Sequence, residues 1–230
     1  MKVLGSVRAG RLLAVFGLVL AVGAGGVACG SHEKKEEPFV GAAEVCNGLF
    51  AGPLAKKVEF VTGDTLFFQV GDRGLDNVVE ALKRGHASGS SWATGAELCP
   101  LHPKGGRAGD EGGLKFFMYA PQDVKDSRMP ADAELYQMGK KAEVRRESAS
   151  LLLECVSPQV KGSSTEPLRI AGSFVRGKSD TPDTRELRDA NLEILHAGAL
   201  SVVKKLGCEK NAGLPDKPDL RLKEGQPGKA

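Results

Sequence analysis

Alternation of apolar and polar residues predicts the strands of this chain. Residues 114–120 alternate most regularly, with apolar side chains at every second position, and Pro121 ends the run. Apolar residues also recur at alternate positions of 149–155, and residues 168–175 form a further apolar run after a loop rich in Gly and Ser. We expect these last two strands to pair as a hairpin, and we expect a polar edge strand at residues 140–146.

Helical spacing of apolar residues predicts a long helix near the C-terminus. Residues 184–206 carry a wide apolar stripe, and Asp183 with Glu186 fits a capping box at its start. Gly207 stands where a glycine commonly ends a helix. A helix of this length extends about 34 Å, which is enough to lie across a sheet of several strands.

The N-terminal half shows shorter and weaker patterns. Apolar residues at helical spacing predict helices at 53–62 and 72–85, and the short apolar run 66–70 fits either a strand or a buried loop. Residues 85–113, rich in Gly and Ser, are expected to be irregular. The polar segment 121–133 is expected to join two halves of the folded domain.

The first 28 residues have the pattern of an export signal. An apolar segment at 12–22 is followed by small residues at 23–28 and then by Cys29. A retained transmembrane helix is the alternative, but residues 12–28 are at the short limit for crossing a hydrocarbon core of about 30 Å and contain several glycines. We therefore expect cleavage before Cys29. The segment preceding the apolar run is positively charged, through Lys2, Arg8 and Arg11.

The cleavage site resembles the bacterial lipobox, in which small residues precede a cysteine that receives a diacylglyceryl group. Val27 and Ala28 fit this pattern, whereas Gly26 replaces the usual Leu, Val or Ile. The resemblance implies lipidation of Cys29, and ordinary signal cleavage with a secreted product is the alternative. Residues 29–40 are mostly charged and polar, and we interpret them as a tether between the lipid and the domain.

Removing the signal also removes the charge excess of the chain. The full sequence has 32 basic and 29 acidic residues, and three of the basic residues lie in the signal. The mature chain therefore has no net formal charge, and it shows no basic face with interleaved aromatic residues. Nucleic acids are accordingly not expected as partners.

Four cysteines remain after Cys29, and an even number in an exported chain favours two disulfides. Three connectivities are open. The equal separations of 53 residues favour Cys46–Cys99 and Cys155–Cys208, each worth about 3–4 kcal/mol in the chain-entropy model. Coincidence is the alternative explanation of the equal spacing, and an overlay of the two halves gives little further support for an internal duplication. Metal binding is disfavoured because no pair has CxxC spacing.

These patterns predict an α+β fold. We expect an antiparallel sheet with a long C-terminal helix packed on one face, a loop-rich N-terminal half and two disulfides. The globular domain is expected to cover residues 41–210, with halves at 41–120 and 134–210. The tail 211–230, rich in Pro, Gly and Lys, is expected to be disordered.

No motif points to catalysis, a cofactor or a metal. Ser201 and Lys204 have the Ser-x-x-Lys spacing of penicillin-binding acyltransferases, but the companion motifs are lacking. His196 in the long helix is interpreted as a packing residue, and the glycines of 105–113 precede a strand, whereas a phosphate-binding loop follows one. Three side chains of the irregular region could line a ligand surface, namely His86, Trp92 and His102.

The segments 153–155 and 205–215, with the four cysteines, resemble a group of small actinobacterial exported lipoproteins of unknown function. The resemblance covers residues 45–215 and implies export and a structural role for the cysteines, without naming an activity. We expect a non-enzymatic module on the outer face of the cytoplasmic membrane that binds an envelope protein or a small ligand. A small-ligand or lipid carrier is the first alternative, and a cell-wall hydrolase is the second.

Overall fold

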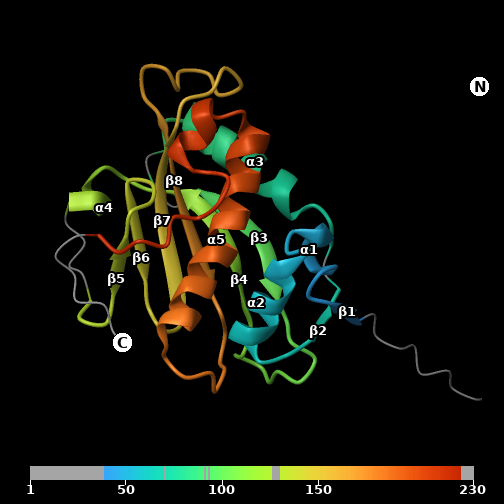
Figure 1. Ribbon diagram of the computed structural model, residues 1–230. Coiled ribbons are helices and arrows are strands. Elements are labelled where there is room, and N and C mark those ends of the chain that lie inside the picture. Colours follow the sequence, from blue (N-terminus) through green and yellow to red (C-terminus); the bar gives the residue numbers. More distant parts are fainter. Residues whose placement is uncertain (1–38, 70, 91, 93, 126–129, 224–230) are drawn as a thin grey trace, which may run out of the picture. The chain divides into compact units, whose positions relative to one another are not determined.

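Six antiparallel strands form the main sheet of the protein (Figure 1). This computed structural model describes residues 39–69, 71–90, 92, 94–125 and 130–223. In the order in which they hydrogen-bond, the strands are β3 (Gly95–Leu101), β4 (Gly112–Met118), β8 (Leu168–Val175), β7 (Ser148–Cys155), β6 (Lys141–Val144) and β5 (Glu134–Tyr136). The expected hairpin is confirmed, because β7 pairs with β8 along its whole length.

Helices cover one face of this sheet. The long helix α5 (Arg185–Leu206) packs on β7 and β8, α3 (Gly74–Ala87) packs on β3, and α2 (Pro53–Thr62) packs against α5 (Figure 1). The smaller elements are β1 (Phe39–Gly41), α1 (Val45–Gly48), β2 (Leu66–Phe68), α4 (Gln122–Lys125) and η1 (Glu209–Gly213). The expected α+β fold, with its long C-terminal helix on an antiparallel sheet, is therefore confirmed.

The core forms where α5 meets the sheet. Along β7 every second residue is buried, as the alternation in the sequence predicts. Two glycines bring the helix close: a Cβ at Gly172 of β8 would lie 2.6 Å from the Phe116 ring, and one at Gly198 of α5 would lie 2.8 Å from Leu114. The space between α5 and the middle of the sheet is filled by direct packing.

The start of α5 differs from the expected capping box. Thr184 is the N-cap residue, and its Oγ1 accepts a hydrogen bond from the backbone N–H of Leu187 at 3.2 Å. Asp183 instead accepts hydrogen bonds from the guanidinium of Arg188. Gly207 ends the helix with φ 68°, which a residue without Cβ adopts readily.

Three expectations for the middle of the chain are wrong. Residues 85–113 are not irregular throughout, because they contain β3. The strand expected at 140–146 is β6, which lies between β7 and β5 and not at the sheet edge. The proposed halves at 41–120 and 134–210 share one sheet, since β4 pairs with β8 across the segment that was expected to separate them.

The chain after α5 is ordered over part of the tail that was expected to be disordered. Leu214 is 3% exposed, and Leu222 forms an antiparallel bridge with Tyr136 of β5. The backbone N–H of Lys223 donates to the carbonyl oxygen of Leu135 at 2.8 Å. Residues up to 223 thus cover the free edge of β5.

Both expected disulfides are confirmed. Cys46–Cys99 ties α1 to β3, with Cα atoms 5.6 Å apart. Cys155–Cys208 ties the end of β7 to the chain just after the C-terminus of α5, with Cα atoms 5.2 Å apart. Among the described residues, the buried side chains and both disulfides lie between Ala42 and Leu214.

Candidate functional site

The two faces of the sheet differ in exposure. Along β4, Phe116 and Met118 are buried toward the helices, whereas Lys115 and Phe117 are exposed on the opposite side. We call this side, turned away from α5, the outer face. Phe117 is 38% exposed and lies next to Ala171 of β8 in the pairing register, so apolar surface on the outer face is in contact with solvent.

A pocket of about 510 Å³ lies on the outer face where β3 and β4 pair. Trp92, which precedes β3, and Phe117 of β4 supply its aromatic surface, and Trp92 is 68% exposed. Glu97, Lys115 and Asp123 supply its charged groups. We refer to these five residues as the Trp92–Phe117 pocket.

A glycine faces the aromatic side of this pocket. Gly95 is the register partner of Phe117, and a Cβ at Gly95 would lie 2.1 Å from the carbonyl oxygen of Phe116. No side chain fits at this position without moving backbone, because the two strands approach too closely. On the β3 side the ring of Phe117 therefore has no side chain opposite it, and its cross-strand neighbour on β8 is the small residue Ala171.

The charged groups of the pocket are partly engaged with one another and with backbone. Lys115 Nζ lies 3.6 Å from Glu97 Oε1 across the β3–β4 pair, and both side chains are substantially exposed. Asp123 Oδ2 accepts a hydrogen bond from the backbone N–H of Ala120 at 2.8 Å. The pocket thus contains both carboxylates and an ammonium group that can form hydrogen bonds, and their charges are partly balanced.

Tyr119 follows Phe117 at the next outward position of the chain and is buried. It is 3% exposed, and its hydroxyl has no hydrogen-bond partner among the described residues. Burial, with a smaller effect from the nearby charge of Glu154, raises the pKa of Tyr119 to about 12. The phenol stays protonated at neutral pH and serves as apolar packing with one unused donor.

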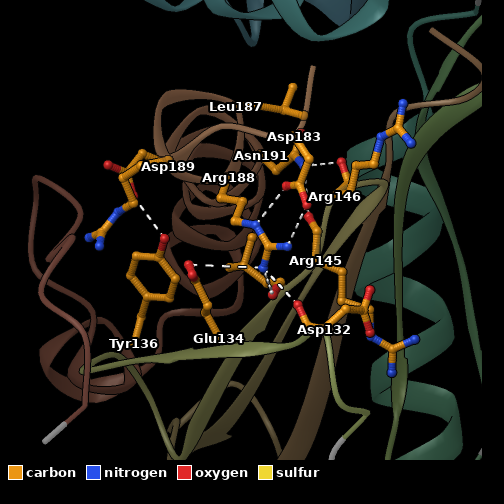
Figure 2. Close-up of polar contacts among 12 residues, drawn as sticks. Asp132, Glu134, Tyr136, Arg145, Arg146, Asp183, Leu187, Arg188, Asp189 and Asn191 are labelled. Carbon is orange, nitrogen blue, oxygen red and sulfur yellow. Dashed lines mark hydrogen bonds and ion pairs between the residues drawn. The ribbon is translucent and has the colours of Figure 1, made fainter. Parts of the chain in front are cut away.

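A second group of polar side chains gathers where α5 begins, against β5 and β6 (Figure 2). Arg188 is 1% exposed, and its guanidinium donates to both carboxylate oxygens of Asp183, at 2.8 and 2.9 Å. It also donates to the carbonyl oxygen of Asp132 at 2.7 Å and lies 3.9 Å from the carboxylate of Glu134. The hydrogen bonds to Asp183 hold the pKa of Arg188 above its ordinary value.

Neighbouring side chains extend this group, which we call the Arg188 cluster. Tyr136 donates its hydroxyl proton to Asp189 at 2.8 Å, and Arg185 donates to the same carboxylate oxygen at 2.8 Å. Asn191 donates to the carbonyl oxygens of Arg145 and Arg146, each at 3.2 Å (Figure 2). Burial, reinforced by the hydrogen bond to Asp189, raises the pKa of Tyr136. The cluster attaches α5 to β5 and β6, and its donors are directed into the protein.

The residues of the Ser-x-x-Lys pattern each have a partner of their own. Ser201 Oγ donates to the carbonyl oxygen of Gly198 at 2.7 Å, and Lys204 Nζ lies 3.4 Å from Asp216 Oδ1. His196 is 3% exposed, and its Nε2 lies 2.8 Å from the carbonyl oxygen of Pro215. Burial lowers the pKa of His196, although the hydrogen bond to Pro215 acts in the opposite direction. His196 thus packs α5 against the segment that follows it.

The three side chains expected to share a ligand surface do not share one pocket. Trp92 lines the Trp92–Phe117 pocket, whereas His86 lines a pocket of about 610 Å³ beside Arg169 and Glu166. The backbone of His102 accepts a hydrogen bond from β2. These residues therefore belong to separate parts of the surface.

The glycine-rich turn and the cysteines do not form ligand sites of the kinds considered from the sequence. Asp64 accepts a hydrogen bond from the N–H of Gly105, and Glu111 accepts one from the N–H of Gly109. These two amides are bound by carboxylates of the chain itself. Cys99 is bonded to Cys46, and among the described residues no group of three or more His, Cys, Asp or Glu side chains could hold a metal ion.

Cys29 and the preceding segment lie outside the described residues, so the structure does not bear on the expected lipidation. None of the described helices combines the length and the apolar character needed to span a membrane. The sequence did not indicate the other four residues of the Trp92–Phe117 pocket, namely Glu97, Lys115, Phe117 and Asp123. Their best signal was the strand at 114–120, which carries aromatic residues on both of its sides.

The fold and the pocket define an α+β protein with two disulfides, one helix-covered sheet face and an aromatic pocket on the other. The chain matches no protein-family model, no curated protein and no solved structure.

Proposed function

We propose that this chain is an exported lipoprotein, held at the outer face of the cytoplasmic membrane by a lipid on Cys29, whose folded domain is a non-catalytic binding module. The proposal rests on which cysteines of the chain form disulfides. The two disulfides engage all four cysteines that follow Cys29 and leave Cys29 out. Disulfides persist in oxidising compartments, and a cysteine behind a signal-like segment is then available for acylation.

The location of the pocket supports binding at the surface over transport in an interior cavity. A carrier for a lipid or an apolar ligand needs space between the helix layer and the sheet. Gly172 and Gly198 instead bring α5 into direct contact with the sheet. The Trp92–Phe117 pocket, on the outer face, offers aromatic surface and polar groups to a partner from outside.

The anchor is tested by replacing Cys29 in the full chain expressed in an actinobacterial host. Wild type is expected to incorporate labelled palmitate and to sediment with membranes. Cys29→Ser is expected to lose the label and to leave the membrane fraction, whereas Ser31→Ala, two residues further on, is expected to behave as wild type. Recovery of unlabelled wild-type protein from the culture medium would contradict the proposal and favour ordinary signal cleavage.

A further inference from the structure

We propose that the Trp92–Phe117 pocket binds an uncharged oligosaccharide, with a sugar ring stacked on Trp92. This inference rests on the proposed binding role and names the chemical class of its ligand. A sugar ring has an apolar face of C–H groups and an edge of hydroxyl groups. The negative face of an aromatic ring attracts such C–H groups, and charged side chains make strong hydrogen bonds to hydroxyls.

The aromatic part of this argument is the exposure of Trp92. At 68% exposed it is the most exposed large apolar side chain among the described residues, and Phe117 at 38% belongs to the same pocket. An indole ring left in water provides a large, rigid contact area at little conformational cost. Because Gly95 has no side chain, the Phe117 ring is open on the β3 side to a ligand that lies beside Trp92.

The polar groups favour a neutral ligand over an ion. Glu97 and Lys115 lie 3.6 Å apart, so their charges largely offset one another. The remaining carboxylate, Asp123, already accepts a hydrogen bond from the backbone N–H of Ala120. A hydroxyl can donate to Glu97 and accept from Lys115. The pocket volume of about 510 Å³ lies within the range of about 300–1,000 Å³ typical of small-molecule sites.

The free edge of β3 argues against an extended peptide as the ligand. Strand addition requires a row of accessible N–H and C=O groups. Pro100 has no N–H, and the pairing of β3 with β4 shifts register between Glu97 and Cys99. Gly74 of α3 lies against the carbonyl oxygen of Leu98, because a Cβ there would be only 2.0 Å from it. A ligand of this region therefore has to bind the outer face and not the edge.

Fluorescence tests the assignment directly, because Trp92 is the only tryptophan of the chain. The chain from residue 30 to 230, which contains the whole described fold, is purified with its disulfides formed and titrated with tetra-N-acetylchitotetraose and with cellotetraose. A saturable change in Trp92 emission is expected with at least one of them, below about 10 mM ligand. Phe117→Ala is expected to weaken binding at least about tenfold, as for loss of a central aromatic contact.

Two further variants separate the site from the fold. Glu97→Gln, on the exposed surface, is expected to weaken binding several-fold without affecting folding, whereas Val175→Ala is expected to bind as wild type. Val175 is the matched control, because it is 45% exposed on the outer face of β8 and lies outside the pocket. Trp92→Phe, followed by calorimetry, is expected to lower affinity without abolishing folding.

The outcomes distinguish this inference from the proposed function. An unchanged emission spectrum with both oligosaccharides, or equal binding by wild type, Phe117→Ala and Glu97→Gln, would overturn the glycan assignment. A response to an apolar peptide in their place would indicate a protein partner and would also overturn it. In each of these cases palmitate labelling of Cys29 would leave the anchored-module proposal standing.

Discussion

Arg188 is a charged side chain with almost no contact with water, and its partners decide its effect on stability. In the sequence it is one of several polar residues along a predicted amphipathic helix. Its burial depends on the carboxylate of Asp183 and on carbonyl oxygens from the segment before β5 and from β6, which are distant in sequence. Local periodicity could place the helix but could not show which of its polar residues is buried.

Replacing Arg188 by Ala is expected to lower the free energy of unfolding by about 3–5 kcal/mol, because it removes the buried ion pair with Asp183 and the guanidinium that donates to the carbonyl oxygens of Asp132 and Val144. Urea unfolding followed by circular dichroism measures the change. Arg84→Ala is the control, since Arg84 is 73% exposed and lies 3.7 Å from Glu80, and its loss is expected to cost no more than about 1 kcal/mol. Equal effects of the two variants would show that the Arg188 cluster does not stabilise the fold.

At the scale of elements, long regular patterns predicted well and short irregular ones did not. The helix predicted at 184–206 is α5, which begins one residue later because Thr184 takes the capping position. β3 was missed because Gly95 and Pro100 give it the composition of a loop. Its strand conformation comes from pairing with β4, an interaction that no local pattern contains.

α5 is also attached to the segment after it, and this attachment is expected to depend on pH. The pKa of His196 is lowered by burial from the ordinary value of 6.5, so the unfolded chain binds the proton more readily than the folded chain. Stability is therefore expected to be full above about pH 6.5 and to fall on acidification, by at most about 1.4 kcal/mol per pH unit from this group. The charged groups near the ring are Glu193, Lys204 and Asp216.

The variant His196→Gln tests whether His196 causes this pH dependence of stability. Glutamine does not titrate and can still donate a hydrogen bond to the carbonyl oxygen of Pro215. Urea unfolding at several pH values between about 7.5 and 5 is expected to give a shallower pH dependence for this variant than for wild type. Parallel curves would mean that other groups cause the acid sensitivity.

At the scale of the whole molecule, the arrangement depends on contacts between distant parts of the chain. β3 and β4 come from one half of the sequence and β5 to β8 from the other, yet they form one sheet. The residues of the Trp92–Phe117 pocket are brought together by the pairing of β3 with β4, which explains why the sequence indicated Trp92 without its neighbours. The disulfides could be predicted because their number and spacing are properties of the sequence itself.

The equal spacing of the two disulfides allows their contributions to be separated. Each spans 53 residues, so the chain-entropy model assigns both about 4 kcal/mol through restriction of the unfolded chain. The double variants Cys46→Ala with Cys99→Ala, and Cys155→Ala with Cys208→Ala, are therefore expected to lose similar amounts from this effect. Any difference between them reports packing in the folded state.

Removing Cys155–Cys208 is expected to lower the free energy of unfolding more than removing Cys46–Cys99. Cys155 and Cys208 are 0% and 7% exposed, whereas Cys46 is partly exposed, so removing the second pair leaves more unfilled space in the core. Urea unfolding of the oxidised wild type and both double variants measures each loss under the same conditions. A larger loss for the first pair would mean that Cys46–Cys99, at the junction of α1 and β3, holds the N-terminal segment on the domain more strongly than burial alone predicts.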